Sequence, residues 1–140
     1  MDPKSFFKNK SICTLPWTGF ELEPDGRVKN CVISQEAIGD INKTNIRDIV
    51  HGEKNVNLKR QMKADAKPSN CSGCYLQEKN RSSLSSISSR LYYLREIAPK
   101  TELDLYDDAK NFSLKHVDLR WTNSCNQACV YCSPRFSSKW

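Results

Sequence analysis

Three closely spaced cysteines near the end of the chain constrain its fold more than any other feature. Cys125, Cys129 and Cys132 have C-x3-C-x2-C spacing and directly follow residues 116–121, an apolar run typical of a β-strand. Three thiolates on one loop can each bind one iron of a [4Fe–4S] cluster, which four cysteines usually hold. With only three, the fourth iron keeps an open position. An open position on a metal is where substrate chemistry takes place.

This loop, with Tyr131 just before the third cysteine, resembles the radical SAM signature. The resemblance implies that 116–121 is the first strand of a partial (β/α) barrel and that Cys125, Cys129 and Cys132 hold a [4Fe–4S] cluster. The unique iron would bind S-adenosylmethionine, and one electron from a reductant such as flavodoxin or ferredoxin would yield a 5′-deoxyadenosyl radical. The substrate class stays open between peptide, protein and small molecule. A zinc site or a redox cysteine cluster is the alternative interpretation.

Four more cysteines lie upstream: Cys13, Cys31, Cys71 and Cys74. Residues 20–23 alternate apolar and polar side chains, 24–26 (Pro-Asp-Gly) provide turn chemistry, and 27–31 form a return strand. The predicted hairpin would bring the first two cysteines near each other at its open end. The last two form a C-x2-C pair whose small intervening residues are expected to let the backbone wrap tightly around a metal.

The spacing Cys13-x12-Gly26-x4-Cys31 resembles the opening of the SPASM domain and of its shorter relative, the twitch domain. The resemblance covers about residues 11–76 and implies that the four upstream cysteines hold one auxiliary iron–sulfur cluster. In the familiar enzymes this domain follows the barrel, whereas here it precedes the radical SAM loop. The assignment of each cysteine to an iron therefore does not carry over. Four thiolates suit tetrahedral zinc equally well, so a structural zinc site is the alternative.

Short elements are predicted between these motifs. Residues 15–17 and 39–41 are expected to be extended. Thr44 is predicted to cap a helix over 45–50, which Gly52 stops.

Two further helices are predicted. The first covers 54–65 and turns Val56, Leu58 and Met62 inward. The second covers 77–98, where leucine and isoleucine recur at three- and four-residue steps, and a flexible serine-rich linker is the alternative there. Residues 100–114 are expected to form a polar connector with one helical turn.

Composition bears on partners and location. The formal net charge is +6, but the densest basic run is expected to be a solvated helix face. Aromatic residues are not interleaved with its lysines, so nucleic acid is not an expected partner. Seven cysteines cannot all pair internally, and their short spacings favour metal. Thiolate ligands suit the reducing cytoplasm, and no membrane span is expected. The two histidines, His51 and His116, are expected to be structural.

Together these features predict an α+β chain in three parts. Residues 11–76 form a small cysteine-rich hairpin and helix domain with one metal cluster, 77–114 form a long helix and connector, and 115–140 begin a radical SAM core. Because such a barrel needs on the order of 200 residues, we expect the chain to be the N-terminal part of a longer protein and to be inactive alone. The alternative function is a non-enzymatic zinc-binding interaction module with a basic face.

Overall fold

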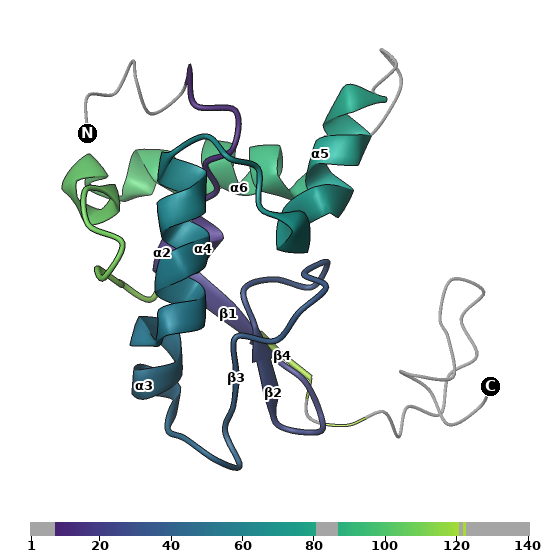
Figure 1. The fold of residues 1–140 in the computed structure, drawn as a ribbon, viewed down its shortest axis with the longest axis vertical. Coiled ribbons are helices and arrows are strands. Elements are labelled where there is room, and N and C mark those ends of the chain that lie inside the picture. Colours follow the sequence, from purple (N-terminus) through teal and green to yellow (C-terminus); the bar gives the residue numbers. More distant parts are fainter. Residues whose placement is uncertain (1–7, 81–86, 121, 123–140) are drawn as a thin grey trace.

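The fold is a mixed α+β arrangement around one small sheet, as predicted. A computed structural model of the protein describes residues 8–80, 87–120 and 122. The sheet has four strands in the order β3-β2-β1-β4. The strands are β1 (Gly19–Leu22), β2 (Arg27–Lys29), β3 (Gly39–Asp40) and β4 (His116–Leu119). Figure 1 shows the sheet toward one end of the molecule and the helices α5 (Ser72–Lys79) and α6 (Ser89–Glu96) at the other. The described residues contain no (β/α) barrel, which stays a prediction.

The predicted hairpin is confirmed. β1 and β2 pair in antiparallel fashion, with Glu21 opposite Lys29. The turn between them needs glycine, because Gly26 has a φ of 90° and a Cβ there would lie 2.1 Å from Nδ2 of Asn42. The short extended piece predicted over 39–41 is β3, which pairs with β2.

The predicted strand before the triple-cysteine loop is β4, and it joins this same sheet. It pairs with β1 in parallel, so that Gly19 faces His116. Backbone hydrogen bonds extend the pairing at both ends, from Lys115 N to Thr18 O (2.7 Å) and from Arg120 N to Leu22 O (2.9 Å). The strand predicted to open a separate core therefore forms the edge of the upstream hairpin's sheet.

Gly19 makes the close contact between these two strands possible. A Cβ at this position would lie 2.6 Å from the backbone oxygen of His116, which cannot move without separating the strands. We therefore expect Gly19→Ala to cost about 1–3 kcal/mol and to release β4 selectively. Amide hydrogen exchange should show lost protection over residues 113–120, with protection kept in α4 (Glu53–Lys63). Gly73→Ala is the matched control, because a Cβ at Gly73 meets no atom within 4 Å. Equal effects of the two variants would contradict the prediction.

Two helices cover the hairpin side of the molecule. α3 (Ile46–His51) ends at Gly52 as predicted, but its cap is Asn45 rather than Thr44. The Asn45 side chain accepts a hydrogen bond from the backbone N–H of Asp48, and this satisfies a free donor of the first turn. α4 then runs over Glu53–Lys63, and Val56, Leu58 and Met62 are buried on it as predicted.

Two further sequence predictions of local structure were wrong. Residues 15–17 are not extended but belong to the short helix α2 (Leu15–Thr18), which Pro16 can enter because the first turn needs no amide hydrogen. The single helix over 77–98 is instead two helices, since α5 ends at Lys79 and α6 begins only after Ser88. The Ser88 hydroxyl accepts a hydrogen bond from Leu91 N, so a serine starts a new helix where continuation was expected.

The connector after α6 contains two 3₁₀ turns, Ala98–Lys100 and Leu103–Tyr106, and lies against the larger apolar core. That core centres on Trp17, whose side chain is fully buried and meets Tyr106 edge to face at 5.6 Å. Its other buried members are Ile12, Cys13, Leu15, Leu58, Met62, Leu94 and Ala98. In the part of the chain that the structure describes, no helix has the length and apolar character needed to cross a membrane.

Candidate metal centre

The four upstream cysteines lie around the larger core. Cys13 is buried in it, and Cys31 and Cys71 pack against it, while Cys74 is buried in the first turn of α5. All four are free thiols. The sulfur of Cys13 interacts electrostatically with each of the other three, which places the four thiols in one region. The predicted proximity of Cys13 and Cys31 agrees with this arrangement.

A side chain next to Cys71 holds the loop that follows Cys31. The Asn70 Oδ1 atom accepts hydrogen bonds from the Ser34 hydroxyl (2.9 Å) and from the backbone N–H of Glu36 (2.7 Å). These contacts join two cysteine-bearing segments that are far apart in the sequence.

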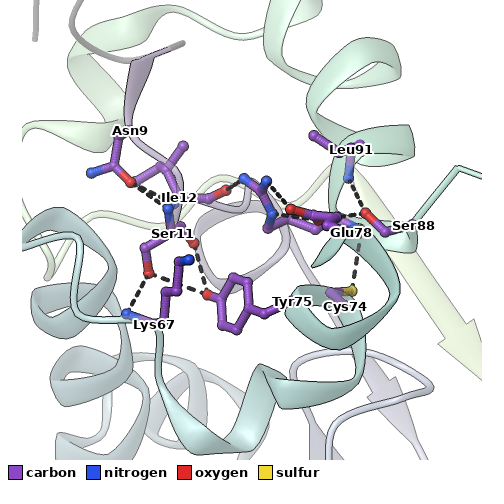
Figure 2. Close-up of polar contacts among 10 residues, drawn as sticks. Asn9, Ser11, Ile12, Lys67, Cys74, Tyr75, Glu78, Ser88 and Leu91 are labelled. Carbon is purple, nitrogen blue, oxygen red and sulfur yellow. Dashed lines mark hydrogen bonds and ion pairs between the residues drawn. The ribbon is translucent and has the colours of Figure 1, made fainter. Parts of the chain in front are cut away.

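A second set of contacts joins α5 to the segment that carries Cys13. The Tyr75 hydroxyl donates to the backbone oxygen of Ser11 (2.9 Å) and lies 3.2 Å from its hydroxyl. Figure 2 shows Tyr75 between Ser11 and Cys74, with Glu78 above them next to Ser88. The side chain of Arg90 also spans this interface, since it donates to the backbone oxygen of Ile12 (2.9 Å). Both bonds fix the residues just before Cys13 relative to Cys74.

The C-x2-C pair is more helical than its sequence predicts. Cys71 ends the 3₁₀ turn Ser69–Cys71, and Cys74 follows on α5. A Cβ added at Gly73, between the two cysteines, would meet no atom within 4 Å. The observed backbone packing therefore does not require a small residue at this position.

Burial dominates the electrostatics of the four thiols. Burial raises the pKa of Cys31 to about 11 and the pKa of Cys71 to about 12. For Cys71, the neighbouring sulfurs of Cys31 and Cys74 raise the pKa further. Burial also raises the pKa of Cys13 and Cys74. The metal-free thiols are therefore protonated at neutral pH. Any metal that binds must displace these protons, so its affinity should rise with pH.

The spacing of the donors distinguishes between two kinds of metal centre. Over residues 8–80, 87–120 and 122, no three histidine, cysteine or acidic side chains lie close enough to hold a single metal ion. Tetrahedral zinc would hold all four sulfurs roughly 4 Å from one another. In a [4Fe–4S] cluster each cysteine binds its own iron, so the cysteine sulfurs stand farther apart than around one zinc ion. A set of soft sulfur donors that is near but not converged on one point fits the cluster better.

Comparison with known proteins also points to an iron–sulfur cluster in this region. Residues 13–75 match the model of the SPASM family, an iron–sulfur cluster-binding domain. The matched SPASM segment begins at Cys13 and ends just after Cys74, so it includes all four cysteines. No curated protein and no solved structure matches the chain. The SPASM match supports iron–sulfur binding as the chemistry of this region.

The described residues do not test the downstream site. Cys125, Cys129 and Cys132 lie outside the described residues, so their role stays a prediction. The two histidines have other contacts, since His51 Nδ1 lies 3.0 Å from Lys110 O and His116 Nε2 lies 3.2 Å from the Tyr93 hydroxyl.

Sequence reasoning missed the residues that hold the cysteine-bearing segments together. These are Asn70, Tyr75, Glu78 and Arg90. The first three lie within four residues of the C-x2-C pair, which is a weak signal at best. Arg90 carries no sequence signal, because its partners are set by how α6 packs on α5.

Proposed function

We propose that Cys13, Cys31, Cys71 and Cys74 hold one auxiliary iron–sulfur cluster in a radical SAM enzyme. The observation that carries the proposal is the gathering of four buried or half-buried thiols inside the segment that matches the SPASM family. When bound, such a cluster stores and passes single electrons. The chain's own part is to bring the four sulfurs together and to exclude water from Cys13 and Cys74, which are buried.

We further propose that Cys125, Cys129 and Cys132 bind the catalytic [4Fe–4S] cluster and that its open iron takes S-adenosylmethionine. This part rests on the spacing of the three cysteines and on their place after a strand, now seen as β4. The substrate would be a peptide, a protein or a small molecule, and the electron donor a flavodoxin or ferredoxin. The proposed setting is the cytoplasm, where thiolates stay reduced.

Two serine variants of the full chain test the two sites separately. One replaces the four upstream cysteines, and the other replaces Cys125, Cys129 and Cys132. After anaerobic reconstitution with iron and sulfide, the unmodified chain should bind about twice the iron of either variant, with about four irons at a [4Fe–4S] site. S-adenosylmethionine should change the electron paramagnetic resonance signal only where the downstream cysteines are intact.

The outcomes separate the proposal from a zinc-binding module. A colourless protein that keeps stoichiometric zinc and takes up no iron or sulfide would overturn the iron–sulfur assignment. If the variant without Cys125, Cys129 and Cys132 lost all iron, the upstream site would be wrong. If it kept all of the iron, the downstream site would be wrong.

A further inference from the structure

An ion pair beside the cysteines connects two of the segments that carry them. Arg90 donates from Nε and Nη2 to the two carboxylate oxygens of Glu78, at 2.8 and 2.5 Å. Its Nη1 donates to the backbone oxygen of Ile12 at 2.9 Å, and Ile12 directly precedes Cys13. Its backbone N–H points at the sulfur of Cys74, 3.4 Å away. One residue therefore contacts both cysteine-bearing segments.

The charges of this pair are shielded from water. The side chains of Arg90 and Glu78 are 7% and 19% exposed, so their fields are screened little by salt. Although burial acts to raise it, the pKa of Glu78 is lowered by hydrogen bonds from Arg90 and Ser88, so the carboxylate is ionised at neutral pH. The pair thus presents a fixed positive and a fixed negative charge.

Both charges lie close to the sulfurs. Arg90 reaches the sulfur of Cys74 through its backbone N–H, and Glu78 follows Cys74 by one turn on α5. A cation and an anion act in opposite directions on negative charge at the sulfurs.

We propose that Arg90 and Glu78 set the reduction potential of the auxiliary cluster, as residues that position its ligands and balance their charge. This rests on the proposed function, because the cluster must be held by Cys13, Cys31, Cys71 and Cys74. Adding an electron increases the negative charge at a cluster, so a nearby cation favours the reduced form and a nearby anion disfavours it. The backbone N–H to the Cys74 sulfur acts in the same sense as the cation.

The test is a potentiometric titration with dithionite, followed by electron paramagnetic resonance. It uses the full chain with Cys125, Cys129 and Cys132 replaced by serine, so that only the auxiliary cluster is observed. Arg90→Gln should lower the midpoint potential, because Glu78 is left unbalanced. Glu78→Gln should raise it, because Arg90 is left unbalanced. Arg90→Lys keeps the charge and should stay close to the parent value.

Opposite shifts are the decisive result, because looser packing alone would not move two variants of one ion pair in opposite directions. Arg95→Gln on α6 is the control, since Arg95 is 65% exposed and its charge is screened by solvent. If Arg90→Gln fails to fold, an upward shift in Glu78→Gln with no shift in Arg90→Lys still supports the proposal. Equal or same-direction shifts in the two neutral variants would overturn it. If the parent protein takes up no cluster, the proposed function itself fails instead.

Discussion

Replacing Trp17 with alanine is expected to lower the free energy of unfolding by about 3–5 kcal/mol, the usual cost of deleting a buried aromatic ring. Trp17 is fully buried at the centre of the larger core. Its Nε1 donates to Asp108 O at 3.0 Å, and its ring packs against Tyr106. The substitution would leave a cavity and an unpaired carbonyl together. Urea unfolding of the metal-free, reduced protein measures the loss.

Two further variants separate the contribution of the Trp17 ring to stability from that of its hydrogen bond, and from the general cost of deleting any aromatic ring. Trp17→Phe keeps most of the apolar volume and should cost about 1–3 kcal/mol, mainly for the lost donor. Tyr92→Ala removes a ring that is 43% exposed and should cost much less. A Trp17→Ala variant as stable as Tyr92→Ala would show that Trp17 does not organise the core. Because Cys13 lies in the same core, Trp17→Ala should also retain less iron after reconstitution.

The second large effect concerns pH and the buried Lys59. Its side chain is fully buried, its Nζ donates to Asn111 O at 2.8 Å, and it lies over the rings of Trp17 and Phe112, at 5.6 Å from each. Burial lowers the pKa of Lys59 from 10.5 to about 8, and the charge of Asp108 offsets this only in part. The lysine thus keeps its hydrogen bond and ring contacts at a cost in desolvation.

The sign of the pH dependence follows from this lowered pKa. Between pH 8 and 10.5 the unfolded chain holds a proton on Lys59 that the folded chain has released, so the stability contributed by this residue rises with pH. The difference between the two pKa values corresponds to about 3 kcal/mol. Below pH 8 both states are protonated, and the full penalty is present.

Lys59→Met is the variant that measures this contribution. We expect the stability of the unmodified protein, relative to Lys59→Met, to rise by about 2–3 kcal/mol between pH 7 and pH 10. Cysteines and tyrosines titrate in both proteins, so their effects cancel in the difference. Lys54→Met is the matched control, because Lys54 is exposed on the same helix and should show no such rise. A constant difference between the unmodified protein and Lys59→Met would contradict the prediction.

The parts of the fold that sequence predicted well depend on local chemistry. Alternating side chains and the turn at Gly26 specify the hairpin, and the apolar spacing of Val56, Leu58 and Met62 specifies one face of α4. The continuous helix over 77–98 failed for a local reason as well. Leu91 and Leu94 of the apolar stripe do pack in or against the larger core. However, the Ser88 side chain accepts a backbone hydrogen bond and caps a new helix.

What the sequence could not predict depends on packing between distant segments. β4 was predicted as a strand, but nothing in its residues shows that its partner is β1. Likewise, the four cysteines were grouped by spacing and resemblance, whereas the Arg90–Glu78 pair beside them follows only from the docking of α6 against α5. Side-chain partners of this kind appear once the tertiary structure is known.

The parallel pairing of β4 with β1 has a consequence for how the protein is made. β1 meets β2 within a few residues, but it meets β4 only after almost one hundred more have been synthesised. Long-range closures of this kind form slowly, because the intervening chain must be ordered first. During translation the backbone N–H and C=O groups on one edge of β1 are therefore unpaired. Another extended peptide could pair with this edge and form a non-native sheet. The nascent chain is most vulnerable to misassociation in the interval before residues 116–119 leave the ribosome.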